Sequence, residues 1–138
     1  MISDKIEFRV RYGETDQMSF AYHGNYAQYL EMGRIEWLRK LGISYKKMEE
    51  TGIMLPVISL NINYIKPAKY DDLLTLKTTL VNKPLVKIKF KFEIYNKNNE
   101  LLTTANVTLA FINSTTKKPT RAPKYLLKKL AEVTDLPL

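Results

Sequence analysis

The sequence predicts an α+β fold in which an antiparallel β-sheet is wrapped around one long central helix. Residues 26–41 place apolar side chains three and four positions apart, which is the spacing of a helix with one buried face. One segment before this helix and four segments after it alternate apolar and polar residues, the period of half-buried strands. Short polar turns between the later strands favour antiparallel pairing, and we expect residues 1–138 to form a single domain.

Individual residues predict where the first strand ends and where the long helix begins and ends. Near the N-terminus, three apolar residues alternate with charged ones and predict a strand that Gly13 ends: Ile6, Phe8 and Val10. After a polar, irregular stretch, Asn25 stands three positions before Gln28, a spacing that resembles a capping box. Gly42 predicts the end of the helix.

The helix is expected to bury one wide apolar face: Tyr26, Tyr29 or Leu30, Gly33, Trp37 and Leu41. A face this wide indicates that the sheet curves around the helix and is not flat. Trp37 and its aromatic neighbours are therefore expected to belong to the core and not to a ligand site. A second short helix is predicted over residues 44–50, ended by Gly52.

Four further strands and a closing helix are predicted over residues 58–64, 74–81, 86–94, 101–112 and 125–132. The strand over 86–94 has one apolar face, made by Val86, Ile88, Phe90, Phe92 and Ile94. Lys87, Lys89 and Lys91 lie on its other face, and we expect this lysine stripe to be solvated and to discourage aggregation.

Composition excludes several kinds of chemistry. The chain has 22 Lys and Arg against 14 Asp and Glu, a net charge of +8, and 45% hydrophobic residues, so we expect a folded domain with an anionic partner. Cysteine is absent and His23 is the single histidine, which excludes disulfides, cysteine-ligated metals, a thiol nucleophile and a multi-histidine metal site. No apolar signal core or membrane-spanning run is present, so a cytoplasmic protein without a membrane partner is expected.

The loop over residues 12–26 is the candidate for chemistry, because it gathers acids, the single histidine, glycines and aromatics before a helix start. A carboxylate among aromatic side chains is poorly solvated, and the helix would direct unpaired N–H groups toward it. A base and an oxyanion-stabilising group would then be neighbours. The alternatives are that Asp16 is a turn residue, that His23 serves packing, and that Glu14 is a solvated loop acid.

Several segments together resemble the 4-hydroxybenzoyl-CoA thioesterase family of hotdog-fold acyl-CoA thioesterases. They are residues 9–12 (RVRY), 14–16 (ETD), 22–26 (YHGNY), Glu31, Arg34, 36–38 (EWL) and 63–72 (NYIKPAKYDD). The similarity covers nearly the whole chain. It implies the hotdog fold, in which the sheet wraps the central helix, and an acyl-CoA substrate.

The resemblance also implies roles for individual residues. Asp16 would be the catalytic nucleophile or base, and the position of His23 would supply a backbone N–H that polarises the thioester oxygen. The expected substrate contacts are four residues of the same loop and helix start, together with one lysine after it in the chain: Tyr22, Asn25, Tyr26, Ser19 and Lys66. Several basic residues are candidates for the CoA phosphates, and the sequence does not rank them: Lys66, Lys69, Lys83, Lys117, Lys118 and Arg121. Ser19 departs from the glycine that the family usually has there. The resemblance implies no cofactor or metal. It does imply a homodimer or homotetramer with active sites between the subunits.

We therefore predict hydrolysis of an acyl-CoA thioester to a free acid and CoA. The alternative is a non-catalytic domain that binds acyl-CoA or an acyl carrier protein. A hotdog dehydratase would need a histidine on the central helix, which offers Glu31 instead. Nucleic-acid binding is disfavoured because the basic residues are dispersed. The acyl group is not predicted by the sequence, and neither is the preference between CoA and a carrier protein.

Overall fold

The computed structural model describes residues 2–133, which form one antiparallel sheet around a long helix. The helices are α1 (Tyr26–Lys40), α2 (Tyr45–Glu50) and α3 (Lys124–Val133), with short 3-10 turns η1 (Tyr12–Glu14) and η2 (His23–Asn25). The strands are β1 (Ser3–Arg9), β2 (Ile53–Met54), β3 (Val57–Tyr64), β4 (Leu73–Leu80), β5 (Lys87–Tyr95), β6 (Leu101–Ala110) and β7 (Ile112–Asn113).

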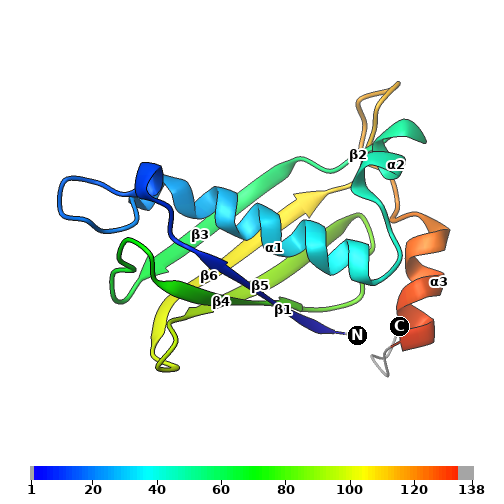
Figure 1. Ribbon diagram of the computed structural model, residues 1–138. Coiled ribbons are helices and arrows are strands. Elements are labelled where there is room, and N and C mark those ends of the chain that lie inside the picture. Colours follow the sequence, from blue (N-terminus) through cyan, green and yellow to red (C-terminus); the bar gives the residue numbers. More distant parts are fainter. Residues whose placement is uncertain (1, 134–138) are drawn as a thin grey trace.

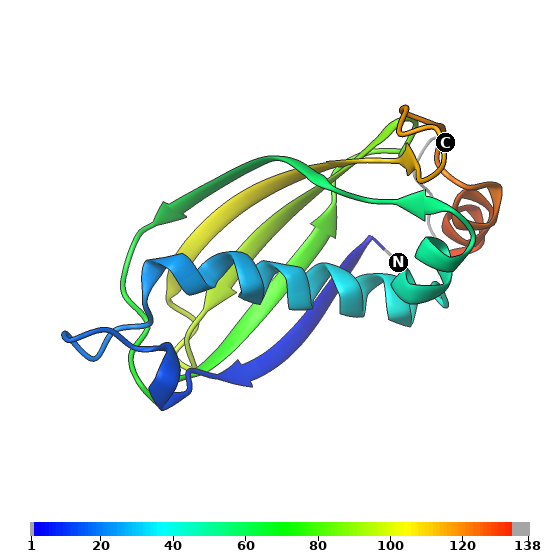
Figure 2. The same cartoon turned by 90° about the horizontal axis from the view of Figure 1, so that it is seen from above.

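The main sheet has five strands in the order β1-β4-β5-β6-β3, and every neighbouring pair is antiparallel. Figures 1 and 2 show α1 lying along the concave side of this sheet, between its two edge strands β1 and β3. The short strands β2 and β7 pair beside α2, at the end of the molecule opposite the N-terminus of α1. The predicted α+β fold with a sheet around a central helix is confirmed.

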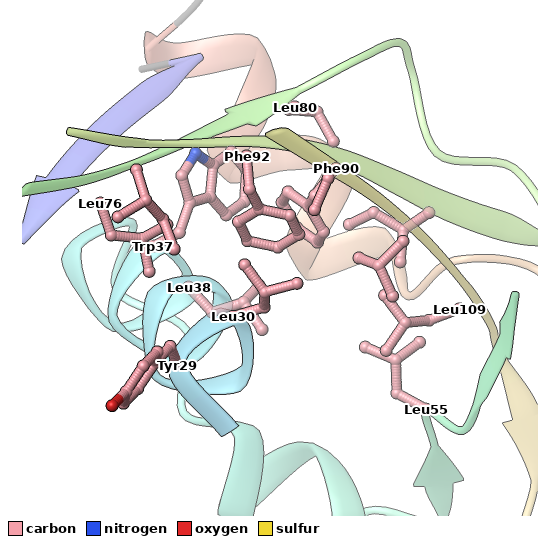
Figure 3. Packing of buried hydrophobic residues seen from close by; sticks show 14 of the residues in the cluster. Tyr29, Leu30, Trp37, Leu38, Leu55, Leu76, Leu80, Phe90, Phe92 and Leu109 are labelled. Carbon is pink, nitrogen blue, oxygen red and sulfur yellow. The ribbon is translucent and has the colours of Figure 1, made fainter. Parts of the chain in front are cut away.

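The core lies between α1 and the concave face of the sheet (Figure 3). The Trp37 ring meets the Phe90 ring edge-on at 5.1 Å, and the Trp37 indole Nε1 donates a hydrogen bond of 2.9 Å to the backbone oxygen of Ile2. Close approach of α1 to β4 requires Gly33, because a Cβ there would lie 2.6 Å from both Leu76 Cδ2 and Thr78 Oγ1. The prediction that Trp37 and the helix face belong to the core is confirmed.

Most predicted elements are present within one to three residues at each end. Gly42 and Gly52 follow their helices with φ of +92°, a left-handed conformation that suits glycine. The predicted capping box at Asn25 is wrong, since Asn25 itself has helical dihedral angles and its side chain makes no capping hydrogen bond. A 3-10 turn precedes α1, so the unpaired amides lie two to three residues earlier than predicted.

Two exposed surfaces of the sheet differ in character. The lysine stripe on β5 (Lys87, Lys89 and Lys91) is exposed, as predicted. Strand β3 is an edge strand that exposes apolar side chains: Val57, Ile58, Leu60 and Tyr64 are 42–51% exposed. An unpaired edge with apolar residues is a surface that another chain can cover.

Candidate active site

The residues of the predicted site lie at one end of the molecule, in a loop that projects beside the N-terminus of α1 (Figure 1). This loop is a tight hairpin over residues 15–21, closed by a β-bridge between Thr15 and Ala21. The Ala21 N–H donates to the backbone oxygen of Ala68 at 2.8 Å, and Phe20 forms a bridge with Lys69. The segment that follows β3 therefore holds the loop in place.

Asp16 sits at the start of the hairpin and is half-buried. Its Oδ1 accepts hydrogen bonds from the backbone amides of Met18 at 2.9 Å and Phe20 at 3.2 Å. These bonds make Asp16 a turn residue, but they occupy one carboxylate oxygen only. Within residues 2–133, Oδ2 accepts no hydrogen bond, so one oxygen orients the side chain and the other is free for chemistry.

Ser19 occupies the tip of the hairpin in a left-handed conformation, with φ of +64°. The Ser19 N–H donates to the backbone oxygen of Asp16 at 3.0 Å, and the backbone oxygen of Ser19 accepts from the Tyr70 N–H at 3.1 Å. Glycine adopts this conformation without the steric cost that other residues carry. The backbone geometry thus explains why a glycine suits this position.

Glu14 is an anchor of the loop and not a solvated acid, so that expectation is wrong. Its side chain is 15% exposed, and its Oε2 accepts from Arg11 Nη2 at 2.7 Å and Nε at 3.0 Å. Its Oε1 accepts from the Arg11 N–H at 2.8 Å and from the Tyr29 hydroxyl at 3.0 Å. Burial alone would raise the pKa of Glu14, but these hydrogen bonds hold it below its ordinary value.

The 3-10 turn η2 presents two backbone amides at the start of the helical segment. The Asn25 N–H is bonded to the Tyr22 oxygen, and the Tyr26 N–H is bonded to the His23 oxygen. Within residues 2–133, neither the His23 N–H nor the Gly24 N–H donates a hydrogen bond. Because the first amides of a helical turn point along its axis, these two are available to an oxyanion.

Aromatic rings surround this turn. The His23 ring is exposed and lies 4.5 Å from the Tyr22 ring and 6.3 Å from the Tyr64 ring, centroid to centroid. The Tyr22 ring covers Gly24 so closely that a Cβ there would lie 2.6 Å from its Cε2. Tyr26 is only 2% exposed, and burial raises its pKa, so it supports the turn from the core side.

The remaining predicted residues have structural partners. The Asn25 side chain donates to the Glu14 backbone oxygen at 2.9 Å, which ties α1 to the loop. Lys66 forms an ion pair of 2.8 Å with Glu100 at the surface. Met54 lies in β2, at the end of the molecule opposite this loop.

The Asp16 loop borders an open depression of about 680 Å³, lined by Tyr12, Gly13, Thr15, Asp16, Gln17 and Ser19. A larger groove of about 870 Å³ lies between β1 and the outer face of α1, and includes neither Asp16 nor His23. Residues 2–133 hold no cluster of three His, Asp or Glu side chains suited to a metal ion. No helix in that range is long and apolar enough to span a membrane.

Comparison with known proteins gives the family. Residues 18–103 match the thioesterase superfamily, which is more than half of the chain. The chain belongs to this superfamily. It is 36% identical over 115 residues to the putative acyl-CoA thioesterase YneP of Bacillus subtilis, covering 83% of each chain. It is 27% identical over 124 residues to the acyl-CoA thioester hydrolase YbgC of Escherichia coli, covering 90% of this chain and 92% of that protein.

Solved structures agree with the fold. The DHNA-CoA thioesterase of Staphylococcus aureus is 38% identical and superposes with a TM-score of 0.89, covering 96% of this chain and 91% of that one. A mutant 4-hydroxybenzoyl CoA thioesterase complexed with 4-hydroxybenzoyl CoA superposes with a TM-score of 0.83 at 18% identity, covering 94% of this chain and 99% of that one. The predicted hotdog fold, thioesterase family and thioester hydrolase class are therefore confirmed.

Proposed function

We propose that residues 1–138 form one acyl-CoA thioesterase domain, in which Asp16 is the catalytic carboxylate and the His23 N–H of η2 binds the thioester oxygen. The observation that carries this proposal is that, within residues 2–133, Asp16 Oδ2 accepts no hydrogen bond and the hydrogen-bonded hairpin that holds it leads directly into a turn with two unpaired amides. A carboxylate and oxyanion donors are the groups that hydrolysis of a thioester requires. The proposal retains the cytoplasmic location expected from the sequence.

The chemistry uses groups that the chain itself supplies. As a base, Asp16 takes a proton from a water molecule whose oxygen attacks the thioester carbonyl carbon. As a nucleophile, its Oδ2 attacks that carbon directly, the C–S bond breaks to release CoA thiolate, and water then cleaves the Asp16–acyl anhydride to give the free acid and restore the carboxylate. In the base route the C–S bond breaks as the tetrahedral intermediate collapses. The proton that the thiolate takes up is the one that Asp16 took from water in the base route, and it comes from the attacking water in the nucleophile route. In both routes the His23 N–H stabilises the developing oxyanion.

A second copy of the chain is part of the proposal, because the site in one copy is open. Apolar and aromatic side chains gather at this end with high exposure: Tyr12 at 79%, Met18 at 66%, Ile65 at 52%, Tyr70 at 52% and Tyr64 at 49%. The unpaired edge of β3 adjoins them. A homodimer or homotetramer would cover these side chains and exclude water from the Asp16 carboxylate.

The net charge of +8 suits a substrate with several phosphate groups. Lys66, one of the candidate phosphate contacts, would exchange its exposed partner Glu100 for a CoA phosphate. Since the Staphylococcus aureus protein is named for DHNA-CoA, an aromatic acyl-CoA should head the substrate panel, followed by branched and straight acyl chains. A parallel panel of acyl carrier protein thioesters tests whether the enzyme prefers CoA or a carrier protein.

The test is the substitution Asp16→Asn, assayed by release of free CoA thiol. Asparagine keeps an acceptor oxygen for the Met18 and Phe20 amides, so the hairpin is retained while the charge is lost. We expect kcat to fall by about a hundredfold or more, because both routes need a carboxylate. The matched control is Asp71→Asn, an exposed loop aspartate with φ of +66°, which asparagine adopts readily.

Parental activity in Asp16→Asn would contradict the catalytic role of this residue. Saturable binding of acyl-CoA to the parental chain, with no release of thiol from any member of the panels, would identify the non-catalytic binding domain instead. Loss of activity in Asp71→Asn as large as that in Asp16→Asn would also count against the proposal, because it would point to general disruption of the loop.

A further inference from the structure

Tyr64, the last residue of β3, makes a hydrogen bond to the turn that carries the two free amides. Its hydroxyl donates to the backbone oxygen of His23 at 2.9 Å. Its ring also meets the Tyr26 ring edge-on at 5.0 Å, so the direction of the hydroxyl is set by packing from the core side. A residue 41 positions away in the sequence thus contacts the main chain of η2.

The His23 oxygen and the Gly24 N–H belong to the same planar peptide group. A donor to the oxygen therefore fixes the orientation of the N–H, which lies in the same plane and points the opposite way. It also polarises the group, because hydrogen bonds in a chain strengthen one another. The Tyr26 N–H donates to the same oxygen, so this carbonyl has two donors while the Gly24 N–H donates to no group in residues 2–133.

We propose that Tyr64 is a positioning residue that orients and polarises the 23–24 peptide, making the Gly24 N–H a second oxyanion donor beside the His23 N–H. The inference rests on the proposed thioesterase function and deepens it, because it assigns a residue of the sheet edge to the oxyanion site. The Tyr64 hydroxyl donates to a main-chain oxygen, so its effect would reach the reaction through the peptide.

The neighbours of the turn support this role. The Tyr22 ring lies against Gly24 and the Tyr64 hydroxyl bonds to the His23 oxygen, so both residues of the 23–24 peptide have a contact that restrains it. Burial raises the pKa of the Tyr64 hydroxyl, which keeps it protonated and able to donate. We propose above that a second copy of the chain covers β3, which is an edge strand. Because Tyr64 ends β3, its hydrogen bond would connect this strand to the peptide that carries the Gly24 N–H.

The test is the substitution Tyr64→Phe, which removes the hydroxyl and keeps the ring. Loss of one hydrogen bond of ordinary net strength corresponds to a fall in kcat of about five- to tenfold. KM should stay within about twofold, since a donor that acts on the transition state does not contribute to ground-state binding. The matched control is Tyr125→Phe on α3, 41% exposed and far from the site, whose hydroxyl makes no hydrogen bond within residues 2–133.

Two measurements separate a positioning role from a structural one. Tyr64→Phe should keep the parental oligomeric state and lose no more than the few degrees of melting temperature that one hydrogen bond is worth, while kcat falls. Tyr64→Leu removes the ring as well, and it should lower both kcat and stability because the contact with Tyr26 is lost. A parental kcat in Tyr64→Phe, or a KM that rises as far as kcat/KM falls, would overturn the proposal.

Failure of this inference is distinguishable from failure of the proposed function. If Asp16→Asn abolishes hydrolysis and Tyr64→Phe retains the parental kcat, the thioesterase assignment stands and the role of Tyr64 is refuted. If Asp16→Asn retains parental hydrolysis, the catalytic assignment itself fails, and the role of Tyr64 in supporting it fails as well.

Discussion

Replacing Ser19 by glycine should stabilise the protein, because Ser19 is held at φ of +64°. A left-handed conformation costs a residue with a Cβ about 1–2 kcal/mol. Glycine avoids this cost but loses more conformational entropy on folding, about 0.5–1 kcal/mol. The difference predicts a net gain of about 0.5–1 kcal/mol for Ser19→Gly.

The contacts of Ser19 make this a clean substitution. Both hydrogen bonds of Ser19 involve backbone atoms alone, so they survive in glycine. Its N–H donates to the backbone oxygen of Asp16, and its backbone oxygen accepts from the Tyr70 N–H. Its side chain is exposed and donates no hydrogen bond within residues 2–133. Ser19→Ala is the control, because alanine lacks the hydroxyl but retains the Cβ and its steric cost.

Thermal unfolding at fixed protein concentration measures the effect. For a chain of this length, a gain of 0.5–1 kcal/mol corresponds to a rise in Tm of roughly 2–4 °C. Ser19→Ala should stay near the parental Tm or below it. If Ser19→Gly melts at or below the temperature of Ser19→Ala, the left-handed conformation is not a source of strain, and the physical reason given for a glycine at this position is wrong.

Two further substitutions test the core and the loop anchor. Gly33→Ala should destabilise the protein by about 1–2 kcal/mol in chemical denaturation, because its Cβ would lie 2.6 Å from buried atoms of Leu76 and Thr78; an unchanged midpoint would contradict the close fit. Glu14→Gln should cost about 1–2 kcal/mol at pH 7, where the carboxylate binds Arg11. Since the folded pKa of Glu14 lies below 4.5, its contribution is present above that value and is lost as pH falls through the folded pKa. The stability of the two proteins should therefore converge in acid unfolding curves, and a constant difference down to pH 2 would refute the assignment.

The long helix shows how much of the fold is local. The spacing of its apolar residues predicts its length and its buried face, and both are confirmed, including Gly33 on the side that meets β4. The alternation over residues 86–94 likewise predicts which side chains of β5 are buried. These patterns are readable because a helix or strand must turn its apolar side chains toward one face to bury them.

The candidate site was only partly predictable from sequence. The loop pattern singled out Asp16 and His23, yet the capping box at Asn25 did not form, because a 3-10 turn precedes α1 and the Asn25 side chain binds the Glu14 backbone. Glu14 reads as a surface acid until the fold brings the Tyr29 hydroxyl to it, although its other partner, Arg11, is only three residues away. Such partnerships depend on where the chain returns in space, and a local pattern does not encode that.

The fold class, the buried face of the central helix and the exclusion of thiol and multi-histidine chemistry follow from the sequence alone, as does the resemblance that singles out the carboxylate Asp16. Only the three-dimensional structure shows that the hairpin holds one oxygen of Asp16 while the other accepts no hydrogen bond within residues 2–133, and that Tyr64 reaches the His23 oxygen. The difference lies in the range over which the interactions act. Periodicity and composition act within a few residues, whereas the partners of a hydrogen-bonding group are set by the packing of α1 against the sheet, which joins segments that are far apart in the chain.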